Sequence, residues 1–265
     1  MKIEYVSLLP VARKLQAMPR DRARFLKYLE IIRTPDGKGC ALPPLVAMNP
    51  MGREHVTALL DDLLAMDADG IAARALAEAV ADLADDPGDF KAGLVIADDL
   101  RGGWTNRFAY EYGYRFLGAG FPGGEIRPPP SMSGVWIAGV LWSSEPAAEQ
   151  TVREAILAAL YRIVYLQRHG GGRTLREMMA QEGWVMAMAG CTRPVLDEDD
   201  LEYTRWVLAP HLDCVPDFRM AVEYLFGDAA GRTLNFTPQG LSPWAGLALA
   251  LHDAPRVSPC SAAAV

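Results

Sequence analysis

The sequence predicts an α+β fold that is predominantly helical, with a small central β-sheet of about two to four strands. Apolar residues recur with helical spacing in both outer parts of the chain, and two short β-branched apolar runs, Ala92–Ala97 and Gly134–Trp142, lie in the middle. With 265 residues, of which 51% are hydrophobic, the chain can bury a sizeable core without disulfide or metal support. We expect a single domain over residues 1–265, with a helical part at 1–87, a strand and loop part at 88–146 and a helical part at 147–265.

The first part of the chain has helical periodicity from Leu8 to about Leu64. Within His55–Met66 the apolar residues recur at i, i+3, i+4, i+7 and i+8, which puts them on one core-facing stripe. These residues are Val56, Leu59, Leu60, Leu63 and Leu64. An alanine-rich helical segment follows at Ile71–Leu83, and Asp85-Asp86-Pro87-Gly88 ends it because no helix interior accepts that sequence.

The segment between the two apolar runs fits two structures. Aromatic residues alternate with other types from Phe108 to Phe116, and this period of two favours a third strand. The segment also fits a helix, because aromatic residues recur at i+4 steps from Trp104 and because Glu111 and Arg115 have the spacing of a helical ion pair. We favour the strand, with a loop after it in either case.

From Glu149 onward the chain has helical spacing throughout. Val152–Leu166 is apolar nearly all round, which predicts a central buried helix that ends at the glycines after His169. Later helix starts carry cap signals. They are Thr174 with Glu177 as a capping box, Asp217 for a helix that ends at Gly227, and Ser242-Pro243 for the last helix. Asp197–Asp200 places acidic residues at a further helix start, where the helix dipole favours them.

Composition and charge exclude several classes of protein. The chain has 33 acidic and 26 basic residues, and a formal charge of −7 argues against a nucleic-acid-binding protein. Its four cysteines lie far apart, which excludes a small disulfide scaffold and a local zinc knuckle. No stretch has the roughly 20 predominantly apolar residues that a membrane span needs, and the charged N-terminal segment does not match a secretory signal. We therefore expect a soluble cytoplasmic protein that binds neither nucleic acid nor a membrane.

Two sequence patterns match known binding motifs without the matching context. Gly118–Gly123 has the form G-x-G-x-x-G, but Pro122 and the prolines after it prevent the helix that would hold a dinucleotide pyrophosphate. His211, Asp213 and His252 follow the order of ligands in non-haem iron oxygenases, which place them on a β-barrel. This third of the chain has helical spacing, so we keep the iron site only as a remote alternative, and no motif identifies a cofactor.

The strongest candidate site follows the first apolar run. Acidic, basic, amide and indole side chains are concentrated within ten residues, after a predicted strand end where ligands often bind. We expect Asp98 or Asp99 to act as a base or metal ligand. The predicted anion-binding residues of this loop are Arg101 and Arg107, with Asn106 beside them and Trp104 covering the site.

The end of the second apolar run adds three polar residues. Ser143, Ser144 and Glu145 follow Trp142 and precede the long helix. If both runs are strands of one sheet, these residues and the Asp98–Arg107 loop converge on one cleft, with Glu145 as a third candidate catalytic carboxylate.

The leading hypothesis is an enzyme or ligand-binding protein for a small anionic molecule. The alternative is a helical accessory or scaffold subunit whose methionine and aromatic surfaces bind a partner protein, and self-association into a homo-oligomer is a related expectation.

Overall fold

The computed structural model describes residues 1–100, 104–116 and 135–255. The chain divides into two compact units. Unit 1 comprises Met1–Arg107 and Gly118–Leu160, and unit 2 comprises Phe108–Leu117 and Tyr161–Val265. That the chain forms a single domain stays a prediction.

Unit 1 contains a parallel sheet of three strands, β1 (Lys2–Tyr5), β2 (Asp89–Ala97) and β3 (Val135–Trp142), in the order β1-β2-β3. The central strand β2 is buried on both faces from Ala92 to Ala97, as expected for a parallel strand covered on both sides. The register pairs Ala97 with Trp142, so β2 and β3 end at the same level.

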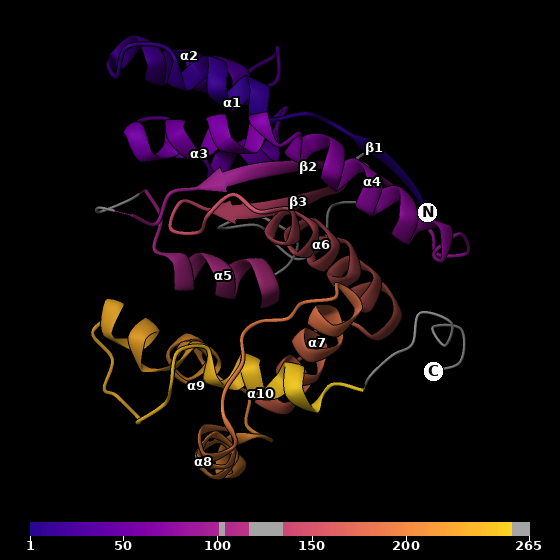
Figure 1. The fold of residues 1–265 in the computed structure, drawn as a ribbon, viewed down its shortest axis with the longest axis vertical. Helices are drawn as coiled ribbons and strands as arrows, with labels where there is room; N and C mark the ends of the chain where they lie inside the picture. Colours follow the sequence, from indigo (N-terminus) through magenta and orange to yellow (C-terminus); the bar gives the residue numbers. More distant parts are fainter. Residues whose placement is uncertain (101–103, 117–134, 256–265) are drawn as a thin grey trace. The chain divides into compact units, whose positions relative to one another are not determined.

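Helices cover both faces of this sheet (Figure 1). α1, α3 and α4 lie along one side of the strands, and the part of α6 up to Leu160 lies on the other side. The helical segments of unit 1 are α1 (Leu9–Gln16), α2 (Arg22–Ile32), the 3-10 helix η1 (Pro43–Ala47), α3 (Glu54–Ala65), α4 (Ala68–Ala81) and the first part of α6 (Glu149–His169).

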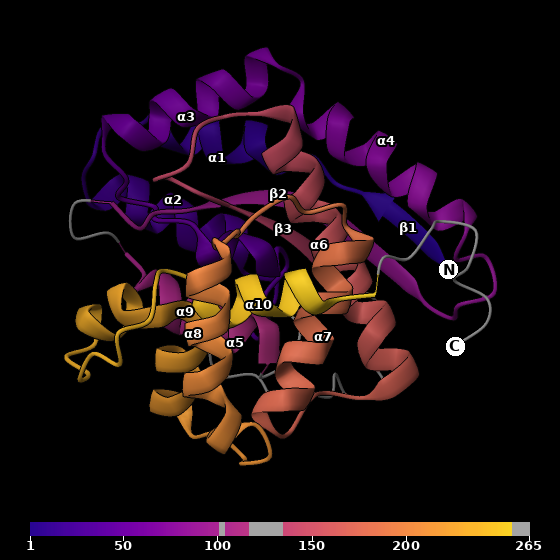
Figure 2. The same ribbon diagram turned by 60° about the horizontal axis from the view of Figure 1, so that its bottom comes forward.

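Unit 2 is helical throughout the residues that the structure describes. α10 is buried from Ala245 to Ala250 and packs against α7, α8 and α9 (Figure 2). The elements of unit 2 are α5 (Arg107–Phe116, from Phe108 on), the last part of α6, α7 (Leu175–Met188), α8 (Glu198–Leu208), the 3-10 helix η2 (Ala209–His211), α9 (Phe218–Thr233) and α10 (Ala245–Asp253).

The core of unit 2 contains buried charge. The carboxylate of Glu182 is fully buried and accepts hydrogen bonds of 2.8 Å from both Nε and Nη2 of Arg162, and a further one from Arg115. Burial alone would raise the pKa of Glu182, but the two guanidinium groups hold it at about 2. The carboxylate is therefore ionised inside the core.

The predicted fold class is confirmed: the chain is α+β and predominantly helical, with a small parallel sheet. Both apolar runs form strands, and the helices at 54–65, 68–81 and 149–169 match the predicted segments. The capping box of Thr174 and Glu177 is present, and Asp197 and Asp217 each cap a helix. The strand β1 is an element that the periodicity did not predict.

The predicted strand at 108–116 is wrong, because this segment is the helix α5. Nε of Arg115 donates to Glu111 at 2.8 Å, so the i, i+4 ion pair forms. Phe108, Tyr112 and Phe116 recur every four residues, so in the helix they share one face, and they pack against the core of unit 2.

Two predicted helix ends differ in detail. Gly227 breaks α9 with φ of 77°, and the helical segment resumes after this kink. Ser242 does not cap the last helix, because α10 begins at Ala245 and Trp244 precedes it in the left-handed region. The Ser242 hydroxyl instead donates to Asp200 at 2.7 Å.

No helix among the described residues is long and apolar enough to cross a bilayer.

Substitution by alanine should have opposite effects on stability at Gly139 in β3 and at Gly113 in α5. The reason is that α6 packs closely against Gly139, whereas the space beside Gly113 is open. A Cβ at Gly139 would lie 2.8 Å from Leu94 and 3.2 Å from the Ile156 backbone, whereas one at Gly113 in α5 would meet no atom within 4 Å. Gly139→Ala should lower the free energy of unfolding by about 1–3 kcal/mol through overpacking. Gly113→Ala should raise it by about 0.5–1 kcal/mol, because alanine is the better helix former.

Urea titrations of the two variants and the wild type measure both effects. The packing account fails if Gly139→Ala is as stable as the wild type.

Candidate functional site

Polar side chains meet at the carboxyl ends of β2 and β3. The backbone N–H of Ser143 donates to the carbonyl of Ala97 at 2.9 Å, which continues the pairing of the two strands by one residue. Asp98-Asp99 and Ser143-Ser144 therefore leave the sheet side by side. This edge of a parallel sheet is where ligands commonly bind.

Asp98 is the most deeply buried member of this group, with 2% of its surface exposed. Its carboxylate accepts hydrogen bonds from Nδ2 of Asn49 at 2.7 Å, from the His55 ring at 2.8 Å and from the Ser143 hydroxyl at 2.9 Å. Asn49 follows η1 and His55 lies in the first turn of α3, so one carboxylate joins three segments to the end of β2.

These hydrogen bonds determine the charge of Asp98. Burial alone would raise the pKa of this carboxyl group, but the bonds from His55, Asn49 and Ser143 favour the ionised form and hold the pKa below its ordinary value. Asp98 is therefore an anion at neutral pH.

The ionised carboxylate fixes the orientation of His55. Because Asp98 can only accept, the ring nitrogen that faces it, Nε2, carries the proton. The other ring nitrogen, Nδ1, is buried and has no hydrogen-bond partner among the described residues. In the neutral ring this nitrogen has a free lone pair, which is the arrangement of a histidine base oriented by an aspartate.

A second group of contacts surrounds Arg107. Asp99 accepts hydrogen bonds from the Ser144 hydroxyl at 2.7 Å and from the Ser144 backbone N–H at 3.0 Å. Arg107 donates to the Ser144 hydroxyl at 3.2 Å and to Glu145, lies 3.6 Å from Asp99, and stacks over the Trp142 ring with 4.9 Å to its centroid. The guanidinium group is thus held between two carboxylates and an indole.

The two carboxylates beside Arg107 differ in exposure. The Asp99 side chain is 9% exposed and the Glu145 side chain is 35% exposed. A partly exposed ion pair contributes little net stability, because water competes for both groups. Of the two carboxylates, Glu145 is therefore the one whose contact with Arg107 costs less to break.

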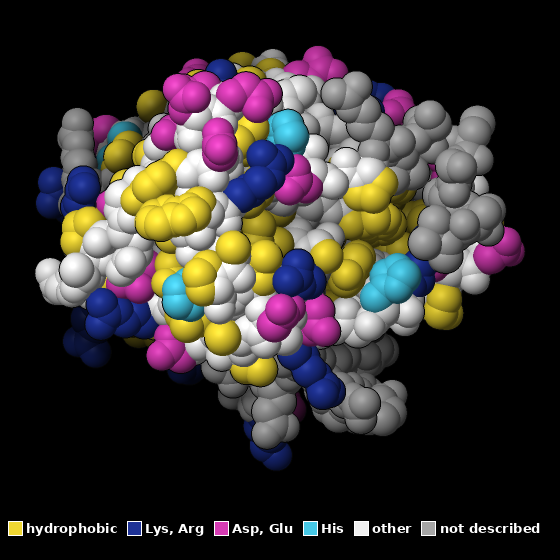
Figure 3. Space-filling view, turned by 90° about the horizontal axis from the view of Figure 1, so that it is seen from below, with side chains coloured by type: hydrophobic (Ala, Val, Ile, Leu, Met, Phe, Trp, Pro, Cys, Tyr) yellow, Lys and Arg dark blue, Asp and Glu magenta, His cyan; other side chains and the backbone are white. Residues whose placement is uncertain are grey.

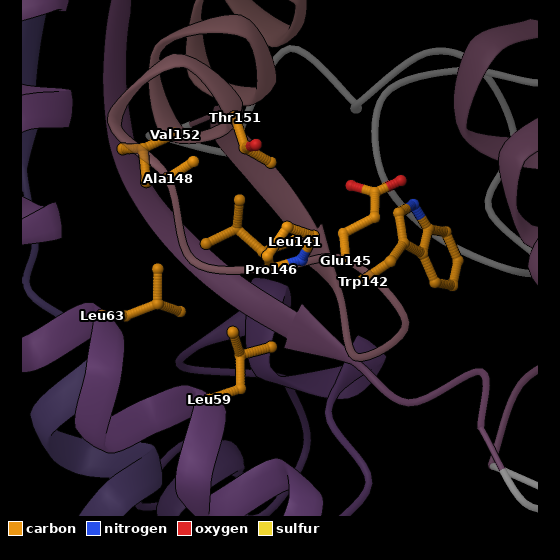
Figure 4. Close-up of a pocket in the computed structure, with 9 residues that line it drawn as sticks. All are labelled: Leu59, Leu63, Leu141, Trp142, Glu145, Pro146, Ala148, Thr151 and Val152. Carbon is orange, nitrogen blue, oxygen red and sulfur yellow. The ribbon is translucent and has the colours of Figure 1, made fainter.

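The turn after β3 also covers a small apolar cavity of about 10 Å³ (Figure 4). Leu59 and Leu63 of α3 line one side, and Leu141 and Pro146 lie over it. This volume is about that of one water-sized probe, so the cavity holds no larger ligand. The polar groups of this edge, and not this cavity, are therefore the candidate ligand contacts.

The structure brings together six of the predicted site residues, namely Asp98, Asp99, Arg107, Ser143, Ser144 and Glu145. Trp104 is 52% exposed, and Asn106 is also exposed. Arg101 lies outside the described residues. The roles of these residues in catalysis or binding stay predictions.

Two members of the site were missed by sequence reasoning, Asn49 and His55. They lie 49 and 43 residues before Asp98, and no local pattern connects them to it. The one available signal was the position of His55 at the start of an amphipathic helix.

The residues of the iron-oxygenase alternative are not brought together. The His211 ring stacks on Tyr224, the Asp213 carboxylate pairs with Arg176 at 2.8 Å, and His252 lies 2.8 Å from Asp253. Within the described ranges, no group of three His, Cys, Asp or Glu side chains could hold a metal ion. The glycine-rich segment Gly118–Gly123 lies outside those ranges.

No protein-family model, curated protein or solved structure matches the chain. The site is therefore interpreted from its own geometry.

The depressed pKa of Asp98 predicts a pH-dependent contribution to stability. The ionised form is favoured in the folded state, so this contribution is fully present above the ordinary value of 3.8 and is lost as the pH falls toward the folded-state pKa. Asp98→Asn should lower the free energy of unfolding by about 1–3 kcal/mol near neutral pH, because the three donors lose a charged acceptor. The difference from the wild type should shrink below about pH 4.

Urea titrations at several pH values measure this difference. Asp85→Asn, which changes an exposed carboxylate in the turn before β2, is the matched control and should show no such trend. A gap between wild type and Asp98→Asn that stays constant as the pH falls well below 3.8 would contradict the assignment.

Proposed function

We propose that the chain is a cytoplasmic enzyme or ligand-binding protein for a small anionic molecule, which binds at the carboxyl ends of β2 and β3. The observation that carries this proposal is the position of Arg107 between Asp99 and Glu145 and over Trp142, at the edge where both strands end. A planar guanidinium group binds carboxylate or phosphate oxygens in pairs.

In the absence of ligand, Glu145 serves as an internal substitute for the anion. The carboxylate of Glu145 accepts a hydrogen bond from Nη2 of Arg107. An anionic ligand would take the place of this carboxylate, while the less exposed Asp99 keeps the arginine in position. The exchange replaces one charge-assisted hydrogen bond by another, so its cost is low.

The enzyme form of the proposal gives His55 the role of general base or acid. Asp98 holds the ring through Nε2, and Nδ1 retains its lone pair. The same division of roles, with a carboxylate orienting an imidazole, is common where a proton moves in catalysis. Asp98 would then be a positioning residue.

The anion proposal predicts opposite effects for two neutralising variants. The probes are dicarboxylates and phosphate monoesters. An anion that raises the Tm of the wild type should raise the Tm of Glu145→Gln by more, because this variant lacks the carboxylate that competes for Arg107. Arg107→Gln should lose the response. Thermal-shift titration of each variant measures the apparent Kd, with an expected gain of about fivefold for Glu145→Gln and a loss of at least about tenfold for Arg107→Gln.

Arg153→Gln is the matched control, because Arg153 forms an exposed pair with Glu78 elsewhere in unit 1. It should respond as the wild type does. If Arg107→Gln retains the wild-type response, or if no anion stabilises the wild type, the proposal is wrong. NMR of the binding anion separates the enzyme from the binding protein: conversion that His55→Asn abolishes while binding persists identifies an enzyme.

The second candidate function is that of a helical accessory subunit that binds a partner protein or a second copy of the chain. Trp206 and Tyr203 on α8 favour it, with 72% and 40% of their surfaces exposed and their rings 5.9 Å apart. Exposed aromatic pairs are enriched in protein interfaces. The methionine surface of this hypothesis has less support, since Met178, Met179 and Met186 are buried.

Sedimentation velocity tests this candidate. The wild type should show a mass above that of one chain at micromolar concentration, and Trp206→Arg should shift it to the monomer. A wild type that is monomeric throughout and a pull-down that recovers nothing would contradict it.

A further inference from the structure

A pocket of about 710 Å³ is lined by residues of unit 2. These residues come from the end of α6, from α7, from α8 with the segment that begins with η2, and from α10 with the residues after it. The volume lies within the range of roughly 300–1,000 Å³ that is typical of small-molecule sites.

The inner surface of this pocket belongs to the packed core. Met179, Leu208 and Leu249 are buried residues that also line it. Two further lining residues, Gly183 of α7 and Ala250 of α10, bring their helices together, since a Cβ on Gly183 would lie 2.4 Å from the carbonyl oxygen of Ala250. Because α7 and α10 already touch there, they cannot move closer at this point to fill the space. The inner surface is therefore formed before any ligand binds.

Aromatic rings and thioethers form much of the remaining lining. The rings of Tyr165 and Trp184 have their centroids 5.5 Å apart and their planes inclined by 53°. Met188 adds a second thioether to that of Met179. Aromatic rings pack favourably against a further ring, and methionine sulfur makes favourable contacts with ring edges. This lining favours a ligand with an aromatic body, whose burial also removes apolar area from water.

The charged side chains at the rim all have partners among the described residues or are otherwise engaged. Arg176 bonds Asp213 at 2.8 Å, and Arg205 bonds Asp253 at 2.7 Å. Arg168, the other arginine of the lining, is not free either. An anion that bound Arg176 or Arg205 would leave a carboxylate without its partner, and a cation that bound Asp253 would leave an arginine without one. Neither sign of charge gains a net partner, and a charged group would give up part of its hydration on entering.

The surface of unit 2 shows the same combination. Figure 3 looks onto the region of α7, α8 and α10, where hydrophobic side chains gather in a hollow. Basic and acidic side chains lie next to one another beside it. The hollow is therefore apolar inside, with charges of both signs at its edge.

We infer that this pocket binds an uncharged, predominantly apolar small molecule with an aromatic ring system. The volume and the inner surface select the apolar body, the rings and thioethers select the aromatic character, and the paired charges at the rim favour a neutral molecule over an ion. The inference does not depend on the function proposed for unit 1, because it rests on other residues and on a ligand of different chemistry.

Isothermal titration calorimetry with three naphthalene derivatives tests the inference on the full chain. Naphthalenemethanol, naphthoate and naphthylmethylammonium, each substituted at the same ring position, share the aromatic body and differ in charge. The alcohol should bind at one site per chain. The anion and the cation should each bind at least about tenfold more weakly, because neither finds a net partner for its charge.

Two variants that fill the pocket locate the binding. Ala180 and Ala209 are exposed, line the pocket and belong to different elements. Ala180→Trp and Ala209→Trp occupy part of the space without removing a core side chain, and each should weaken binding of the alcohol by at least about tenfold. Ala229→Trp is the matched control, because Ala229 is an exposed residue of α9 outside the lining, and it should bind as the wild type does.

NMR of the wild type gives a second location that needs no filled pocket. With carbon-13 in the methionine methyl groups, the naphthalene protons of the bound alcohol should show NOEs to Met179 and Met188. Met220 of α9 lies outside the lining and should show none.

Three results would overturn the inference. The first is the absence of binding of the alcohol. The second is binding of naphthoate or of naphthylmethylammonium as tightly as the alcohol. The third is binding of the alcohol without NOEs to Met179 and Met188, or with an affinity that a folded filling variant leaves unchanged.

Discussion

The buried carboxylate of Asp98 is the interaction on which the site in unit 1 depends. It stands at the end of the central strand, and its hydrogen bonds to Asn49, His55 and Ser143 join the start of α3, the segment after η1 and the end of β3. A buried charge is stable only when donors surround it, so these segments cannot move independently without leaving the carboxylate unsatisfied. The rigid end of the sheet in turn supports the exchangeable contacts around Arg107.

The two units differ in the chemistry of the side chains that they bring together. The cluster in unit 1 is polar, combines three carboxylates with one guanidinium and one imidazole, and lies beside a water-sized cavity. Unit 2 contains a larger pocket of about 710 Å³ with a lining that is mainly apolar.

The sequence was most informative where structure is determined locally. The β-branched runs, the helical stripes and the capping residues Asp197 and Asp217 each depend on neighbours a few residues away, and these elements formed as expected. Parallel strands that end in register also explain why residues 98 and 143 meet. His55 could not be predicted, because its contact with Asp98 spans 43 residues. The segment 108–116 satisfied two periodicities, and packing of Phe108 and Tyr112 on a distant core decided between them.

The protonation of the His55 ring tests the central role of Asp98 most directly. Long-range nitrogen-15 NMR distinguishes the two ring nitrogens, and His55→Asn assigns the signal among the four histidines. The account predicts that Nε2 carries the proton in the wild type and that Asp98→Asn changes the tautomer equilibrium. A neutral ring in the wild type with its proton on Nδ1 and a bare Nε2 would contradict it, because an ionised Asp98 cannot donate to that nitrogen.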